Sequence, residues 1–478
     1  MQKKKFIVDI AILLVLNLLI KPFWTIIIEP KVQGQIGDID YGEYFVIFNF
    51  TLLLNIFLDF GLTNFNSRNI AQNNQLLSKH LGKMMSLKLT LGIFYFIICY
   101  LVGHLMLGFK LPMLMLLCFN SFLLSFNVFL RSNLQALHLF RTDSILSVLD
   151  RLIQILILVA MLLHVFGMQI NAMAFILAQT VGYLFTGLTC YFIVLNKTHN
   201  YKFNFDYAFC RMVLKKSLPF AILVLLMAFY NRLDSIMIEK LLGGDYGKEQ
   251  SGVYAKSFRL LDAANQIATL FSIQLIPIFS RMLKNKDNME NIIKLSYTLL
   301  ITPALIVSIS SIFYAEYFFT KIYTGDTKGF EILQILMSCF TAICLTCVFG
   351  TLLTASGNLK KQNIAAIGGI VVNVILNFIL IPKYQAYGSA ISSLVTQMLT
   401  GIAQVIICYK VFNFNVNKRI LISTFTFVAG LFIVNLITIN LTRVTELNFV
   451  IMLLFSGLLA FITGLINPKS ILRFIKYK

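Results

Sequence analysis

The sequence predicts an all-α polytopic membrane protein with about fourteen transmembrane helices. Apolar residues make up 58% of the 478, whereas charged residues make up only 13%, about half the share of an ordinary soluble domain. The mean hydropathy is +0.82. Apolar runs long enough to cross the hydrocarbon core, which takes about 20 residues, follow one another from Phe6 to Ile466. We therefore expect the chain to cross a membrane many times.

Positive charge dominates the ionisable residues, and its distribution predicts an orientation. The formal net charge is +20, yet the basic residues lie in short connections beside the apolar runs, so we expect no nucleic-acid partner. Alternate connections hold most of them, including Lys79, Lys83 and Lys88 after the second run, which assigns these connections to the cytoplasm. Both termini are then cytoplasmic, and the basic N-terminus begins a first helix that is retained.

Residue types that support enzyme chemistry are scattered. Cys344 and Cys347 have CxxC spacing but lie in an apolar run without a second ligand pair, and the five histidines form no ligand pair. The sequence has no phosphate-binding loop or nucleophile elbow, and no connection long enough for a catalytic domain. We expect no enzyme, no metal site and no bound cofactor, with H⁺ or Na⁺ coupling left open.

An internal repeat sets the predicted domain organisation. Tyr41–Tyr44 (YGEY) opens the second run and Ser251–Tyr254 (SGVY) opens the eighth, while Ala136–Ile145 aligns with Ala355–Ile364 at nearly the same offset. Six spans have been duplicated, and because six is even, both copies enter the membrane from the same side and share a cavity between them. The expected domains are an N-terminal six-helix bundle (1–200), a C-terminal six-helix bundle (201–412), and two additional transmembrane helices with a basic cytoplasmic tail (413–478).

Three motifs resemble one known family. They are DYGEYF at Asp40–Phe45, DFGLTNFNSRNIA at Asp59–Ala71, and RLDSIMIEKLLGG with the following SGVYAKSFRLLD at Arg232–Asp262. They are similar to motifs of the polysaccharide transporters and O-antigen (Wzx-type) flippases in the multidrug/oligosaccharidyl-lipid/polysaccharide (MATE-like) superfamily. The resemblance covers the first twelve spans; the last two, from Ile420, match the family in number only.

This resemblance implies two six-helix bundles facing a central cavity. The implied activity is translocation of an undecaprenyl-diphosphate-linked oligosaccharide, for O-antigen, capsule or another surface polysaccharide, from the cytoplasmic to the periplasmic leaflet of the bacterial inner membrane. Its partners would be the lipid-linked oligosaccharide, membrane lipids and a polysaccharide polymerase or chain-length protein. The alternatives are a MATE-type multidrug or ion antiporter, a lipid II flippase and, less favoured, a membrane glycosyltransferase or polymerase.

Polar residues at helical spacing are expected to line the cavity. Lys256, Arg259 and Asp262 share one face of the eighth run, and Asn17 and Lys21 share one face of the first. An ion facing lipid at mid-depth costs about 2.5 to 3.5 kcal/mol on insertion scales, so such residues turn toward water or a partner. The alternative is that they hold helices together within a bundle.

Two ion pairs are possible in the hairpin between the seventh and eighth runs. Arg232 and Asp262 lie at equal distances from its turn, as do Asp234 and Arg259. Arg232 and Asp234 are about 200° apart around a helix, so both cannot face the next helix. We expect Arg232–Asp262 to pair and the other charge to face the cavity; a static pair that only joins two helices is equally compatible.

Arginines near the predicted cytoplasmic ends are candidates for binding the diphosphate, because a guanidinium offers a fixed fork of donors. Arg131 and Arg151 are the first choices, although Arg131 could instead extend to the interface. Lys21, Arg232 and Arg259 complete the predicted substrate-binding set.

Three carboxylates are candidates for ion coupling. Asp59 is the first, because it lies on a polar face and has no basic residue within one helical turn. Asp262 and Asp234 follow. The alternative for Asp59 is that it is solvated at the cytoplasmic interface.

Overall fold

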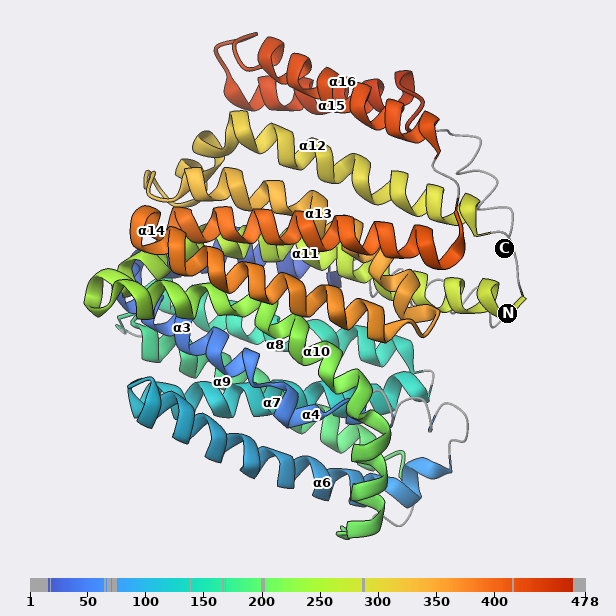
Figure 1. Ribbon diagram of the computed structural model, residues 1–478. Coiled ribbons are helices and arrows are strands. Elements are labelled where there is room, and N and C mark those ends of the chain that lie inside the picture. Colours follow the sequence, from blue (N-terminus) through green and yellow to red (C-terminus); the bar gives the residue numbers. More distant parts are fainter. Residues whose placement is uncertain are drawn as a thin grey trace. The chain divides into compact units, whose positions relative to one another are not determined.

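The computed structural model describes residues 16–17, 19–63, 66, 70, 75–137, 139–165, 167, 169–198, 203–285, 289–414 and 417–466. Within these residues every regular element is a helix (Figure 1). Nine of the described helices are long and apolar enough to cross a membrane. The predicted all-α membrane fold is therefore confirmed, whereas the count of fourteen spans stays a prediction.

The chain forms two compact units, Met1–Gly252 and Val253–Lys478. The predicted domain boundaries follow the internal repeat and stay a prediction. Helices of the first unit are η1 (Trp24–Ile28), α2 (Glu29–Ile36), α3 (Asp38–Leu53), α4 (Ile56–Asp59), α6 (Leu76–Cys99), η2 (Tyr100–Met106), α7 (Leu111–Ala136), α8 (Phe140–Leu162), α9 (Ala172–Leu195) and α10 (Tyr207–Leu242). The second unit contains most of α11 (Gly244–Asn285), then α12 (Glu290–Ile322), α13 (Phe330–Ala355), α14 (Leu359–Phe412), α15 (Lys418–Thr438) and α16 (Thr445–Ile462).

Side-chain caps mark where several helices begin. Asn171, Asp206 and Asn417 each accept a hydrogen bond from a backbone N–H of the first turn, at the start of α9, α10 and α15. Such a cap satisfies one of the N–H groups that a helix start leaves without an internal partner. In the first unit α9 packs against α7 and α8, and α3 packs against α7 and α10.

The second predicted span is broken rather than continuous. α3 ends at Leu53, and the short α4 ends before Phe60 and Gly61, whose φ values are 45° and 76°. A positive φ is strained for phenylalanine and natural for glycine, so the DFG sequence ends the helix. Asp59 therefore lies at a helix end and not on a continuous helical face.

Two glycines from the internal repeat meet inside the first unit. A Cβ at Gly42 of α3 would lie 1.9 Å from the carbonyl oxygen of Lys248, and a Cβ at Gly252 would lie 2.1 Å from that of Asp38. The Gln33 side chain also donates to the Gly252 carbonyl at 3.0 Å. The beginning of α11 can approach α3 this closely only because both positions lack a side chain.

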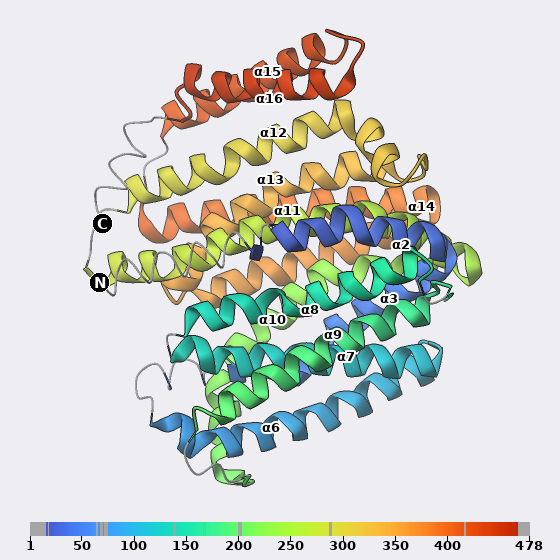
Figure 2. The same cartoon turned by 180° about the vertical axis from the view of Figure 1, so that it is seen from behind.

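The second unit is built around α12, α13 and α14. The long α14 is two helical limbs, because Gln385 has φ 56° and ψ −138° shortly after Pro382. The final helices, α15 and α16, pack on α12 through a core that includes Phe427 and Leu431. Figure 2 shows the same elements from behind.

Candidate functional site

Three of the five predicted substrate-binding residues come together in the first unit. Lys21, from the helical residues before η1, lies close enough to Arg131 of α7 and Arg151 of α8 for their charges to act on it, together with Asp150. We call Lys21, Arg131 and Arg151 the cation cluster. Its members come from three different helices, so it forms only when these helices pack.

Arg131 is fixed by a buried acid. Its Nε donates to Asp143 Oδ1 at 2.7 Å, and Gln135 Nε2 donates to the other carboxylate oxygen at 2.9 Å. Asp143 is only 2% exposed, whereas the Arg131 side chain keeps 20% of its surface exposed. The guanidinium is therefore oriented by a rigid partner and still reaches the surface of the unit.

Arg151 is held by aromatic rings. Its guanidinium carbon lies 5.0 Å from the ring centroid of Trp24 and 6.0 Å from that of Tyr183. Its Nη1 also donates to Gln154 Oε1 at 2.9 Å. Trp24 begins the π-helical η1 and stacks on Phe175 at 6.1 Å between ring centroids. Stacking on ring faces orients an arginine without neutralising it.

A second charged group lies between α4, α6 and α7. Lys88 has no exposed surface, and its Nζ donates to Asp59 Oδ1 at 2.8 Å and to Ser125 Oγ at 2.8 Å. Thr63 donates to Asp59 through both its backbone N–H and its hydroxyl group. The Asp59 side chain is 27% exposed. In the Lys88–Asp59 pair the lysine is therefore fully buried, whereas the carboxylate is partly exposed.

This arrangement corrects two points of the sequence interpretation. Lys88 was assigned to a cytoplasmic connection, but it lies buried within α6, a candidate membrane span. Asp59 was expected to lack a basic partner, but α6 supplies one at 2.8 Å. Residues within one helical turn of Asp59 do not reveal this partner, because the contact joins two helices that are separated in sequence. Whether Asp59 couples transport to an ion stays a prediction.

The other predicted site residues lie on α10 and α11. Arg232 Nη1 donates to Asn49 Oδ1 of α3 at 3.2 Å, and Asp234 is 2% exposed. Arg259 and Asp262 are half-buried in the part of α11 that belongs to the second unit. The expected pairing of Arg232 with Asp262 joins residues of different units and stays a prediction.

Asn17, from the predicted polar face of the first run, is one of several buried polar residues that join helices within the first unit. Asn17 donates to Ser147 at 2.8 Å, and Gln179 donates to the Tyr44 hydroxyl at 3.0 Å; all four are buried. These side chains therefore hold helices together within the unit, which was the alternative to lining a cavity. Lys21 differs from Asn17 on the same face because it is only half-buried.

In the second unit Lys256 is buried beside the α12–α13 connection. It forms an ion pair with Asp326, and its own carbonyl accepts a hydrogen bond from the Tyr323 hydroxyl at 2.8 Å. Desolvation alone would raise the pKa of Asp326, but hydrogen bonds from Lys256 and the Lys328 backbone hold that pKa below its ordinary value. This lysine therefore anchors a connection. Among the described residues, His, Cys, Asp and Glu form no group that could hold a metal ion.

Sequence reasoning missed Asp143, Trp24 and Lys88. Asp143 could have been found, because it and Arg131 lie at similar distances from the short α7–α8 connection, the same argument that paired Arg232 with Asp262. No comparable signal marks Trp24, which reaches Arg151 from a distant helix.

Comparison with known proteins identifies related sequences. The sequence model of a family described as polysaccharide biosynthesis protein matches residues 7–283. An uncharacterized membrane protein of Methanocaldococcus jannaschii is 25% identical over 206 residues, which are 43% of this chain and 46% of that protein. The match therefore spans less than half the length of this curated relative.

Several solved structures have a similar fold. The lipid II flippase MurJ in an inward closed conformation matches with a TM-score of 0.70 and 14% identity, over 96% of this chain and 97% of that one. An inward-facing MATE multidrug resistance transporter of the MOP superfamily has a TM-score of 0.60 and 16% identity, over 85% and 97%. The Vibrio cholerae MATE transporter VcmN in its bent form has a TM-score of 0.55 and 14% identity, over 85% and 96%. At these identities the similarity establishes the fold alone.

Proposed function

This chain belongs to the polysaccharide biosynthesis protein family, as its motifs predict, and from that premise we propose that it is a flippase for a lipid-linked oligosaccharide. The substrate we propose is an undecaprenyl-diphosphate-linked repeat unit, moved from the cytoplasmic to the periplasmic leaflet of a bacterial inner membrane. The observation that carries the proposal is the cation cluster, because a diphosphate is the part of such a substrate that most needs charged partners.

The two arginines of the cluster would act differently on the diphosphate. Arg131 shares its charge with Asp143, so it would orient the head group through the donors that face away from the acid. Arg151, held by Trp24 and Tyr183, would bind the diphosphate through a guanidinium that is oriented by ring stacking. Lys21 would add a third, more adaptable cation to the same place.

Reconstitution tests this function. Vesicles containing the chain would be loaded with a polyprenyl-diphosphate oligosaccharide, and the fraction accessible to an external lectin would be followed with time. We expect Arg151→Gln to slow translocation at least ten-fold, and Arg151→Lys to recover only part of it, because an ammonium lacks the planar fork. Lys383→Gln, which removes an exposed lysine of α14, is the matched control. Equal rates in the parent and Arg151→Gln would refute the assignment.

The same vesicles separate the alternative substrates. A lipid II flippase would move lipid II in preference to the oligosaccharide lipid, and a multidrug antiporter would move a cationic drug against an ion gradient and neither lipid. Our proposal requires the oligosaccharide lipid to be the preferred substrate of the three.

We also propose that an ion gradient drives the transport, with Asp59 as the first coupling candidate and Asp262 and Asp234 after it. We expect protonation of the partly exposed Asp59 carboxylate to leave the buried Lys88 without its counter-charge, and this loss would change the packing around Lys88. Asp59→Asn in vesicles with an imposed pH gradient tests this. A parent chain that ignores the gradient, or a variant that still responds to it fully, excludes Asp59.

The proposed orientation places both termini in the cytoplasm. Single cysteines at Lys248 and Lys328 should then react with an impermeant thiol reagent added outside the cell, whereas one at Lys286, which lies outside the described residues, should not. Labelling of all three would contradict this topology. A polysaccharide polymerase or chain-length protein is the partner we propose for the periplasmic side.

A further inference from the structure

The residues that lead into α10 and its first turns, 203–218, are docked on α6 by one face. Asp206 Oδ2 lies 2.6 Å from Lys83 Nζ, and the Ser86 hydroxyl donates to the Asn204 carbonyl at 2.9 Å. The Phe209 ring stacks on that of His80, with 4.9 Å between centroids. These contacts fix the position of the 203–218 segment in the first unit, and Figures 1 and 2 both show the beginning of α10 beside α6.

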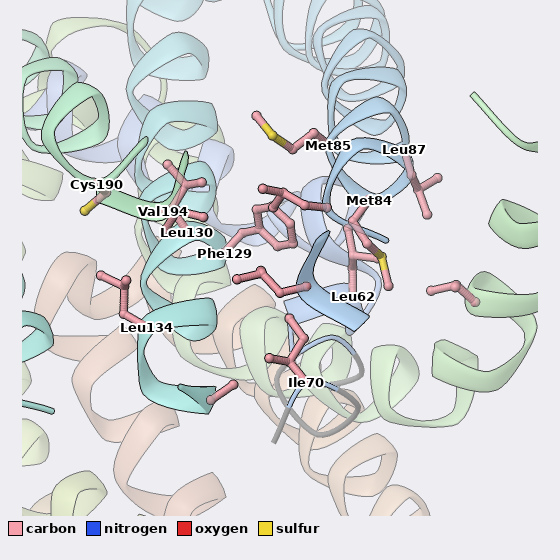
Figure 3. Close-up of a cluster of buried hydrophobic side chains, with 14 of the residues drawn as sticks. Leu62, Ile70, Met84, Met85, Leu87, Phe129, Leu130, Leu134, Cys190 and Val194 are labelled. Atoms are coloured by element: carbon pink, nitrogen blue, oxygen red, sulfur yellow. The ribbon is translucent and has the colours of Figure 1, made fainter. Parts of the chain in front are cut away.

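The docked face continues into a hydrophobic core. Cys210 and Val213 are buried, 4% and 0% exposed, in a cluster that includes Met84 of α6 and Leu130 of α7. Figure 3 shows Met84 and Leu130 within this cluster. The segment is therefore a packed part of the unit with one defined outward face.

The outward face combines aromatic and basic side chains. Phe203, Phe205 and Tyr207 are 59%, 52% and 71% exposed. Arg211 and Lys215, one helical turn apart, are also exposed. Two cations at this spacing repel each other along a helix, and an anion beside them relieves that repulsion. The face thus presents rings that favour an interface and charges that favour an anion.

The length of α10, which contains the seventh span predicted from the sequence, indicates that this face lies at the edge of the membrane. α10 has 36 residues, and about 20 suffice to cross the hydrocarbon core. The apolar part of its sequence begins near Leu218, so the turns of α10 before Leu218 are not needed to cross the hydrocarbon core. A segment that joins the polar surface to a span at this point lies at the level of the lipid headgroups.

We propose that the outward face of the 203–218 segment is a binding site for anionic phospholipid, with Arg211 and Lys215 on the phosphate and the three aromatic rings among the upper acyl chains. Charge complementarity with an anionic leaflet favours lipid over another protein as the occupant, because the two cations and the three rings share one outward face next to the start of a predicted span. The proposal is independent of the transport function.

Thermal unfolding of the full chain in a neutral detergent tests this site. Phosphatidylglycerol should raise the unfolding midpoint by several degrees more than phosphatidylcholine of the same acyl chains. Arg211→Gln/Lys215→Gln should weaken this response, requiring roughly thirty-fold more phosphatidylglycerol, since each of the two basic residues near an anionic surface contributes about 1 kcal/mol. Lys31→Gln/Lys383→Gln removes two exposed lysines elsewhere and should respond as the parent does.

Three outcomes would overturn the proposal. Equal midpoints in the two lipids would exclude a preference for anionic headgroups. An equal loss in the control variant would show that only net charge matters. A full response to soluble glycerol phosphate would mean that the site binds a free phosphate and not a lipid.

Discussion

Two lysine–aspartate pairs on α6 use the same chemistry in different surroundings. Lys83 lies 2.6 Å from Asp206, with the two side chains 25% and 33% exposed. Lys88, five positions later, lies 2.8 Å from Asp59, with the side chains 0% and 27% exposed. The distances are almost equal, so burial of the lysine is what distinguishes the pairs.

This difference decides what happens when an acid is lost. Water can solvate Lys83 in place of its partner, and a half-exposed pair contributes little to stability. Lys88 has no exposed surface, so without Asp59 its charge would remain in an apolar environment with only Ser125 as acceptor among the contacts described above. The buried pair can therefore transmit a change of charge to the packing of α4, α6 and α7, and the surface pair cannot.

The largest effect should follow Asp59→Asn. Removing one partner of a buried pair costs about 3 to 5 kcal/mol, so we expect a clear fall in the unfolding midpoint of the purified chain. Adding Lys88→Met should restore much of the stability, because the uncompensated charge is then gone. A double variant no more stable than Asp59→Asn alone would show that the two residues are not coupled.

A smaller effect should follow Arg131→Gln. Asp143 remains buried, but Gln135 still donates to it, so the expected cost is about 1 to 3 kcal/mol. Denaturant unfolding in detergent measures this loss, with Gln135→Ala as the comparison that removes the other donor. A cost as large as that of Asp59→Asn would mean that the hydrogen bond from Gln135 does not compensate the buried Asp143 carboxylate.

Lys83→Gln should have a still smaller effect. Its partner is at a solvated surface, and Asp206 also caps α10 through the Phe209 N–H at 3.0 Å, a contact that the substitution leaves intact. The unfolding midpoint should stay closer to that of the parent than it does in Arg131→Gln. A fall as large as in Arg131→Gln would contradict the distinction drawn between the two pairs of α6.

The smallest expected effect is a pH dependence of the surface pair. Hydrogen bonds from Lys83 and the Phe209 backbone hold the pKa of Asp206 below its ordinary value. The stabilisation is then fully present above about pH 4, the ordinary carboxyl value, and is lost as the pH falls through the lower folded value. The difference in midpoint between the parent and Asp206→Asn should shrink over this range; a constant difference would contradict the assignment.

Much of the fold could be predicted because it depends on local composition. The apolar runs place α7, α8 and α9 where the structure has them, and the fold brings the predicted residues Lys21, Arg131 and Arg151 near one another. Their binding role remains a proposal. The polar face of a helix depends only on the spacing of residues within that helix, so it can be predicted from the sequence.

The contacts that neutralise or orient these charges could not be predicted so well. Lys88 looked like a connection residue because a complete apolar run follows it, and its burial depends on Asp59 from the broken second span. Trp24 reaches Arg151 from a π-helical turn that no residue pattern marks. Such contacts depend on which helices become neighbours, which periodicity within one helix does not specify.

The contact between Gly42 and Gly252 has an evolutionary consequence. Each glycine occupies the matching place in one copy of the predicted repeat, and each lets a backbone carbonyl of the facing helix approach closer than a methyl group would allow. Alanine at either position would force the two helices apart, even with glycine kept at the other position. Because neither position can accept a side chain without moving a backbone carbonyl, both glycines should persist together in related chains even where the surrounding motifs have been lost.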